Sequence, residues 1–317
     1  MNPYGADGGP PASPHPHPAP GLGPAPWGRI AVGVPGVEFE SRPAGEDAFD
    51  VPDTECDGWS TPGLTLRFAS VRGAHHRYYR RPRQDAARAV SHQSSGTVVF
   101  AVADGVSSAT NAELGALEAC RAAVERTLLQ LSWSTAALDL QDITRYAAER
   151  LRRLARGRLN KAEPSDAEVA GLYATTLVTG VVRPHPDGPL VQLCRVGDSG
   201  AWLLDRPHGR YHPLFSSKTG SDTLLVSNEV TPLPSVPDRI EQATVRLTTD
   251  LALLVGTDGF GDPLGDGDGQ VGVLFARHLA QPPPPLWLAH VLDFSRETFD
   301  DDRTLLAVWP RDPEPRR

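Results

Sequence analysis

Hydrophobic and polar positions alternate in short, regular patterns from about residue 64 onward. The run Leu64–Val71 alternates as a strand with one buried face does. Further short apolar runs bounded by turn residues predict six more strands: 97–103, 175–182, 190–196, 201–204, 251–256 and 304–310. Apolar residues at helical spacing predict one helix after residue 110, a second over 136–159 and a helical stretch near 287–298. Because strands alternate with paired helices and not with single crossovers, the pattern favours an α+β sandwich over a doubly wound parallel sheet.

Residues 1–60 have a different composition. The first 26 are mostly Pro, Gly, Ala and His, and 39–61 are acidic and rich in turn formers. Such segments bury too little apolar surface to offset the loss of chain entropy. We therefore predict a disordered tail and linker over 1–60 and one folded domain over 61–312. Within that domain the polar, Pro-rich segment 206–249 is expected to form long loops or a flap.

Composition and charge exclude several classes of function. The 317 residues carry a formal net charge of −8, which disfavours nucleic acid or an anionic membrane surface as a partner. No apolar run approaches the roughly 20 residues of a membrane span, and no basic start followed by an apolar run indicates a secretory signal. The three cysteines lack metal-ligand spacing. We expect reduced thiols and a cytoplasmic protein, and the amino-acid usage is typical of a bacterial source.

Three short acidic motifs, each beside a strongly apolar run, carry the candidate chemistry: Val98–Gly105, Leu251–Gly259 and Asp300–Val308. An aspartate at the edge of a buried strand is costly to desolvate unless a positive charge meets it. Three such aspartates in similar contexts predict that they converge on a hard cation such as magnesium or manganese.

Five blocks in a fixed order carry a family resemblance. They are Arg83-Gln84-Asp85-Ala86, Val102-Ala103-Asp104-Gly105, Ala174-Thr175-Thr176-Leu177, Arg195-Val196-Gly197-Asp198-Ser199, and Gly256-Thr257-Asp258-Gly259 followed by Asp301-Asp302-Arg303-Thr304. With these blocks, residues 64–310 resemble the metal-dependent type 2C protein Ser/Thr phosphatases (the PPM family). The resemblance implies a four-layer αββα sandwich, in which two antiparallel β-sheets are flanked by helices.

The resemblance also implies a site with two divalent ions, Mn or Mg. Asp104 would bridge both ions, and the backbone carbonyl of Gly105 would bind one of them. Asp258 and Asp301 would complete the carboxylate ligands of the other. Asp85 would act mainly through metal-bound waters. Such a pair of ions clamps a phosphate and lowers the pKa of a bridging water, and hard cations of this size take oxygen ligands.

The resemblance also implies a phosphate-clamping arginine, which in many members of the family precedes the aspartate of the first block by about five residues. Arg80 stands there, and a guanidinium fork suits a phosphate better than a lysine does. Three further arginines lie close in sequence and leave the choice open: Arg77, Arg81 and Arg83.

Two further assignments keep alternatives. His76 or its neighbour His75 would be the general acid that protonates the leaving alkoxide, and a surface histidine without a catalytic role is the other interpretation. The ligand in the last block is assigned to Asp301 because the family pattern Asp-(Asn/Asp)-x-(Thr/Ser) selects it over Asp300 and Asp302.

The chain departs from the common family pattern in three places. Gln84 replaces a carboxylate of the first block, and Ser107-Ser108-Ala109 replaces a Gly-Gly pair. Both departures resemble a bacterial subgroup of the family. A third metal, which many bacterial members hold, would need Asp166 or Glu168, and neither matches the family position well.

The preferred hypothesis is a phosphatase that hydrolyses phospho-Ser/Thr of a phosphoprotein, acts in signal transduction and opposes a bacterial Ser/Thr kinase. Two alternatives come from other classes: a non-catalytic phosphoprotein-binding module with the same fold, and a scaffold that recruits partners through its Pro-rich tail. Retention of Asp104, Asp258 and Asp301 favours the enzyme, because a degenerate site usually loses a metal ligand.

Overall fold

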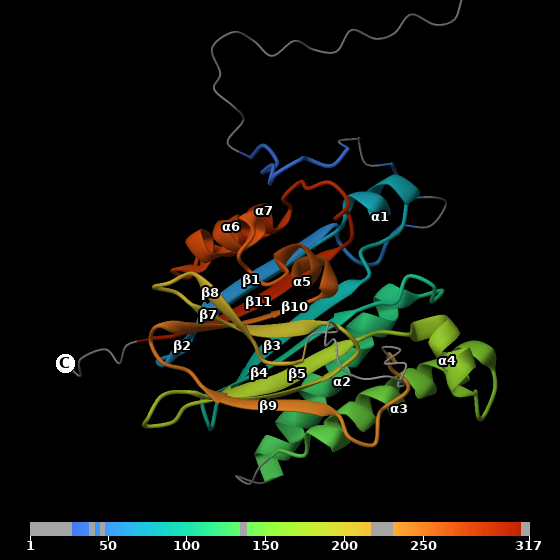
Figure 1. The fold of residues 1–317 in the computed structure, drawn as a ribbon. Coiled ribbons are helices and arrows are strands. Elements are labelled where there is room, and N and C mark those ends of the chain that lie inside the picture. Colours follow the sequence, from blue (N-terminus) through green and yellow to red (C-terminus); the bar gives the residue numbers. More distant parts are fainter. Residues whose placement is uncertain (1–26, 38–41, 45–47, 134–137, 217–230, 312–317) are drawn as a thin grey trace, which may run out of the picture.

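The computed structural model describes residues 27–37, 42–44, 48–133, 138–216 and 231–311. Two antiparallel sheets form its centre (Figure 1). The first sheet has the strand order β1 (Thr54–Ser60), β2 (Leu64–Val71), β11 (Arg303–Pro310), β10 (Leu251–Gly256), β7 (Gly200–Asp205) and β8 (Arg210–Pro213). The second has the order β3 (Asp85–His92), β4 (Thr97–Asp104), β5 (Leu177–Arg183), β6 (Leu190–Val196) and β9 (Glu241–Arg246).

Helices cover the outer face of each sheet. The second sheet is covered by α2 (Ala112–Trp133) and α3 (Leu140–Leu159), against which α4 (Asp166–Tyr173) packs. The first sheet is covered by α5 (Asp258–Leu264), α6 (Gln270–Leu279) and α7 (Pro285–Leu292). A short helix, α1 (Ala74–Tyr79), connects the two sheets between β2 and β3. These four layers confirm the predicted αββα sandwich.

The alternation of side chains along each strand divides the core into layers. In β2, Leu66 and Phe68 face the other sheet and pack with Phe100 of β4. On the opposite face of β2, Ala69 and Val71 pack with the helices α5 to α7. Strand positions buried on both faces therefore read as nearly continuous apolar runs, which is why the central strands were predictable.

Two parts of the predicted organisation are wrong. Residues 54–60 belong to β1, which pairs with β2 over its whole length, so the linker prediction fails there and the sheet begins before residue 61. The segment 206–249 contains β8 and β9 and is not loop throughout. β1, β8 and β9 are edge strands with solvated faces, so their sequences lack the apolar run on which the prediction relied. The tail over 1–26 and the centre of the predicted flap, 217–230, lie outside the described residues.

Helix bounds differ modestly from expectation. α3 begins at Leu140, where the side chain of Asp139 accepts a hydrogen bond from the backbone N–H of Asp142. α7 ends at Leu292, before the predicted end near 298. Among the described residues, no helix combines the length and hydrophobicity needed to cross a bilayer. The three cysteines are free thiols, and Cys194 is buried in β6 as predicted.

Candidate functional site

The predicted acidic residues come together where strands of both sheets end. Asp85, the first residue of β3, pairs across the ladder with Asp104, the last residue of β4. In the other sheet, β10 and β11 are antiparallel neighbours, so Asp258, just after β10, and Asp301, just before β11, lie at a common end. The carboxyl groups of Asp104 and Asp258 are close enough for each to shift the pKa of the other, which joins the two pairs.

Asp85 fastens the two sheets to each other at this end. One of its carboxylate oxygens accepts hydrogen bonds from the hydroxyls of Thr257 and Thr304, each at 2.8 Å. The backbone N–H of Thr304 donates in turn to the Thr257 hydroxyl at 3.1 Å. Asp85 is only 3% exposed, so it is placed to support its neighbours and not to meet a substrate directly.

The backbone of Asp104 is held by the Thr-Thr block. The Thr175 hydroxyl and the Thr176 N–H both donate to the Asp104 carbonyl at 2.8 Å. The Asp104 N–H donates to the Thr176 hydroxyl at 2.9 Å, and that hydroxyl lies 2.7 Å from Ser199 Oγ. The two threonines are structural, as expected, and they leave the Asp104 carboxylate available to its acidic neighbours.

The cluster has an excess of negative charge. Burial, followed by the charges of Asp85 and Asp258, raises the pKa of Asp104 well above its usual value. Burial likewise raises the pKa of Asp85, and it raises that of Asp258 to about 6. Burial and the charge of Asp302 raise the pKa of Asp301. An all-oxygen donor set with a shortage of positive charge fits magnesium or manganese, which prefer oxygen ligands and favour the ionised carboxylates.

The two adjacent aspartates of the last block have different environments. Asp302 is 3% exposed and accepts hydrogen bonds from the backbone N–H groups of Gly73 (2.7 Å) and Gln84 (2.6 Å). Asp301 borders, together with Asp258, a small cavity of about 220 Å³. Since the Asp302 carboxylate is occupied by protein groups, this geometry favours Asp301 as the metal ligand.

The four neighbouring arginines also differ. Arg77 pairs with Asp53 (2.8 Å) and Asp293 (3.0 Å). Arg83 is buried and pairs with Glu55 at 3.0 Å, and Arg81 donates to the Ser107 carbonyl at 3.3 Å. Arg80 is exposed at the C-terminal end of α1, and its side chain makes no hydrogen bond or ion pair with the described residues. Neither Arg80 nor Arg81 pairs with a carboxylate among the described residues, and of the two only Arg80 has a side chain without any hydrogen bond to them, so Arg80 is the more available for an anion.

His76 is not a surface histidine. Its side chain is 2% exposed, and its Nδ1 lies 2.9 Å from a carboxylate oxygen of Asp302. Burial lowers its pKa, but the contact with Asp302 and the nearby charges outweigh this, and the pKa is raised overall. Potential ligand atoms of His76, Asp301 and Asp302 lie within 4.8 Å of one another, although the imidazole and Asp302 already face each other. The alternative, His75, is half-buried.

The two candidates for a third metal hold α4. Asp166 pairs with Arg152 at 3.0 Å. Glu168 pairs with Lys161 at 2.7 Å and forms a capping box with Ser165 at the start of the helix. Both acidic side chains are exposed and engaged by α3, by the turn that follows it or by α4 itself, which gives no support to a third metal site.

A pocket of about 650 Å³ borders Asp258 on the side of β7 and α5. Trp202 forms part of the pocket wall. Its indole packs against Gly200 and Gly261, where an added Cβ would come within 2.4 Å and 3.0 Å of the ring, so only glycine fits at these positions without a shift of the ring. The sequence did not single out Trp202, because an isolated tryptophan in a strand is most simply a core residue. The threonines that hold Asp85, by contrast, belong to the same motifs as two of the predicted ligands: Thr257 directly precedes Asp258, and Thr304 follows Asp301 by three residues. That proximity in sequence was the available signal.

Comparisons with known proteins agree with this architecture. The solved structure of RsbX in complex with magnesium is 14% identical, with a TM-score of 0.51 over 81% of this chain and 100% of that one. A bacterial serine phosphatase is 16% identical, with a TM-score of 0.55 over 79% and 99%. The Ser/Thr phosphatase Stp1 from Staphylococcus aureus is also 16% identical, with a TM-score of 0.55 over 87% and 100%. At such identities the likeness establishes the fold.

Sequence comparison gives a family. No curated protein matched the chain. The family model described as protein phosphatase 2C matches residues 72–293, which is more than half of the chain and includes Asp85, Asp104 and Asp258. The chain therefore belongs to the protein phosphatase 2C family.

Proposed function

We propose that this protein is a metal-dependent phosphatase that removes phosphate from phosphoserine and phosphothreonine of a protein substrate. The observation that carries the proposal is the convergence of Asp104, Asp258 and Asp301, with their shared shortage of positive charge, at one end of the sandwich. Family membership supports the reaction class, and magnesium in the related RsbX structure supports the type of ion.

Asp104, Asp258 and Asp301 would hold two divalent ions, Mn or Mg, together with the backbone carbonyl of Gly105. When bound, such ions neutralise the phosphate and lower the pKa of a bound water. The loop at Gly105 is closely packed, since an added Cβ there would come within 2.4 Å of the Ala112 carbonyl oxygen. The chain therefore keeps this backbone in one place, which a ligand carbonyl requires.

The remaining polar residues position groups around that centre. Arg80 would bind the non-bridging phosphate oxygens with its uncommitted guanidinium. Asp85 would orient bound water through its free oxygen, because its other oxygen is taken by two threonine hydroxyls. A proton donor must reach the leaving oxygen. The half-buried His75 suits that role better than the fully buried His76, whose contact with Asp302 suits positioning.

The substrate would enter over the pocket beside Asp258, and we expect it to be a phosphoprotein made by a bacterial Ser/Thr kinase. A non-catalytic phosphoprotein-binding module with this fold is the alternative. It would bind a phosphopeptide without turnover, and it would not require a set of carboxylates whose pKa values are raised by burial and by one another's charges.

Hydrolysis of p-nitrophenyl phosphate and of a phosphothreonine peptide tests the proposal. Each is measured with manganese, with magnesium and with EDTA. We expect turnover with either metal and none with EDTA. Folded protein that binds the phosphopeptide but releases no phosphate with any metal would contradict the enzyme and support the binding module.

A further inference from the structure

An N-terminal segment lies along the loop that connects α7 to β11. We call residues 29–36 the N-terminal strap and residues 293–300 the α7–β11 loop. Four hydrogen bonds join them: Ser295 N–H to the Ile30 carbonyl (2.7 Å), Val32 N–H to the Ser295 carbonyl (2.9 Å), Glu297 N–H to the Val34 carbonyl (2.8 Å) and Gly36 N–H to the Ser295 hydroxyl (3.1 Å). Val32 is buried among the core residues under α6 and α7. Trp27, just before the strap, packs its ring 5.3 Å from that of His290 in α7.

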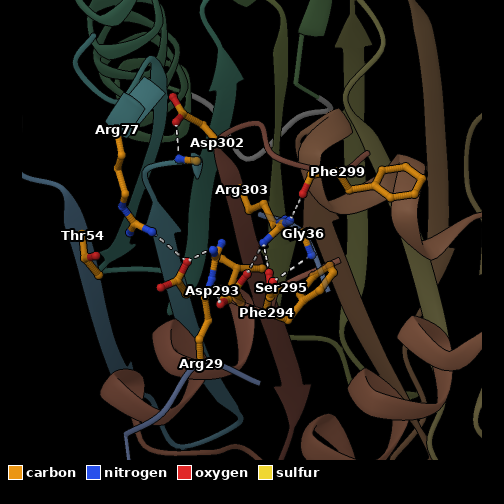
Figure 2. Close-up of polar contacts among 12 residues, drawn as sticks. Arg29, Gly36, Thr54, Arg77, Asp293, Phe294, Ser295, Phe299, Asp302 and Arg303 are labelled. Carbon is orange, nitrogen blue, oxygen red and sulfur yellow. Dashed lines mark hydrogen bonds and ion pairs between the residues drawn. The ribbon is translucent and has the colours of Figure 1, made fainter. Parts of the chain in front are cut away.

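Asp293 connects the strap and the loop to α1. Its carboxylate meets Arg29 of the strap at 3.1 Å and Arg77 of α1 at 3.0 Å, as Figure 2 shows. Arg29 also donates from Nε to the Asp293 backbone carbonyl at 2.8 Å. Arg80, the candidate phosphate clamp, follows Arg77 by three residues at the end of the same helix. One carboxylate thus joins the strap, the start of the loop and the helix that carries the clamp.

The other end of the loop leads to the candidate metal ligand. The buried Arg303 lies beneath the loop and donates to the carbonyls of Leu292 (3.3 Å), Phe294 (2.6 Å) and Phe299 (Figure 2). The Asp300 carbonyl accepts a hydrogen bond from the backbone N–H of His75 at 3.0 Å. The loop is therefore bound at its start by the strap, underneath by Arg303 and at its end by α1, immediately before Asp301.

We propose that Asp293 is a positioning residue through which the N-terminal strap sets the placement of Asp301 and of Arg80 at the end of α1. This inference rests on the proposed function. Without the strap, the backbone N–H groups of Ser295 and Glu297 lose their partners and Asp293 faces one arginine in place of two. The loop then has more conformations available, and the arrangement that brings Asp301 to the metal and Arg80 to the phosphate is populated less.

Manganese binding by titration calorimetry and p-nitrophenyl phosphate kinetics in the full chain test the proposal. The variants are Arg29→Gln and Asp293→Asn. The matched control is Asp53→Asn, which removes the other carboxylate partner of Arg77 without touching the strap. We expect Arg29→Gln and Asp293→Asn to weaken manganese binding and raise KM, each about 5-fold, with a smaller change in kcat. Asp53→Asn should leave manganese affinity within about 2-fold of wild type, and Asp293→Glu should recover part of the loss.

Manganese affinity equal to wild type in folded Arg29→Gln and Asp293→Asn proteins would overturn the proposal. An equal loss in Asp53→Asn would do so as well, because it would assign the effect to α1 alone. If Asp293→Asn does not fold, Arg29→Gln and Ser295→Ala decide, since the latter removes the hydroxyl that meets Gly36. A wild type that neither binds manganese nor turns over would instead refute the proposed function.

Discussion

Two groups of aspartates lie at the same end of this molecule and have opposite electrostatic surroundings. Asp53 and Asp293 each meet arginine, with Arg77 bridging them. Although burial acts to raise the pKa of Asp53, its contacts with Arg77 outweigh that effect and lower it. Asp104 and Asp258 lie beside each other and have no arginine among the causes that shift them. Burial, followed by the charges of other aspartates, raises the pKa of both. The first group is already neutralised by the chain, whereas the second requires an external cation.

This difference separates structural from functional acids by a physical criterion. A carboxylate paired with an arginine contributes to folding whether or not a ligand is present. Carboxylates crowded together without such a partner reduce stability unless a cation or protons arrive. Mutations in the two groups should consequently have opposite effects on the metal-free protein.

The largest effect is expected from Asp104→Asn. Loss of the ligand that would bridge both ions should lower kcat/KM by more than the roughly 10- to 100-fold that is typical of residues which only orient a ligand. The same change removes one repelling charge, so the metal-free protein should unfold at a higher temperature than wild type. Phosphatase kinetics and thermal unfolding in EDTA measure the two outcomes. A metal-free protein that becomes less stable would contradict the contrast between the two groups.

Manganese should stabilise the protein more at pH 7.5 than at pH 5. The pKa of Asp258 is about 6 in the folded protein, above its usual value of 3.8, so the folded state binds more protons than the unfolded state between these values. Metal-free stability from this group is therefore highest at low pH and falls as the pH rises through about 6.

Manganese at 100 times its Kd should add about 2.7 kcal/mol at pH 7.5 and much less at pH 5, where protons compete for the site. Denaturant titrations at both pH values, with manganese and with EDTA, check this; equal increments at the two pH values would argue against carboxylate ligands.

Arg80→Gly should affect stability and activity in opposite directions. Arg80 has a φ of 59°, in the left-handed region, which costs a residue with a side chain about 1 kcal/mol relative to glycine. The variant should therefore be more stable by about that amount and lose about 10-fold or more in kcat/KM through the missing charged hydrogen bonds. Arg81→Gly is the matched control, and it should not stabilise the protein. Unchanged kcat/KM in Arg80→Gly would remove Arg80 as the phosphate clamp.

The smallest effect is expected in the arginine-paired group. Asp53→Asn should reduce the free energy of unfolding by about 1 kcal/mol, because the Asp53 side chain is 42% exposed and solvent screens its pair with Arg77. Urea denaturation in EDTA measures the change. A gain in stability, as predicted for Asp104→Asn, would show that the two groups do not differ in the way that their contacts indicate.

The candidate ligands were predictable because their signals are local. Asp104 and Asp258 follow buried strands and precede glycines, and each motif can be recognised without knowing what lies opposite. The central strands were predictable for a related reason, since burial on both faces leaves continuous apolar runs. The edge strands β1, β3, β8 and β9 were not predicted, because hydrogen bonding to a neighbour, and not an apolar run, stabilises them.

The roles of the arginines depended on distant partners. Arg77, Arg80, Arg81 and Arg83 look alike along the chain. The positions of Asp53, Glu55 and Asp293 set Arg77 and Arg83 apart, and a bond to the Ser107 carbonyl separates Arg81 from Arg80. His76 followed the same pattern, because nothing near it in sequence indicates that Asp302 lies 2.9 Å away. Residues 29–36 pair with 293–297, and this pairing joins parts of the chain more than 250 residues apart, which no pattern of neighbouring residues can indicate.

The sequence by itself determined the interior strands, the αββα architecture implied by its motifs, and the set of acidic residues from which the candidate site is built. The tertiary structure alone decided which acids are neutralised by arginine, which arginines have no carboxylate partner among the described residues, and that the N-terminal strap pairs with the loop before Asp301. The reason is physical. Strand formation and acidic motifs depend on neighbours in sequence, whereas the state of a charge depends on which opposite charge folding brings within a few ångströms, and on how much water it excludes.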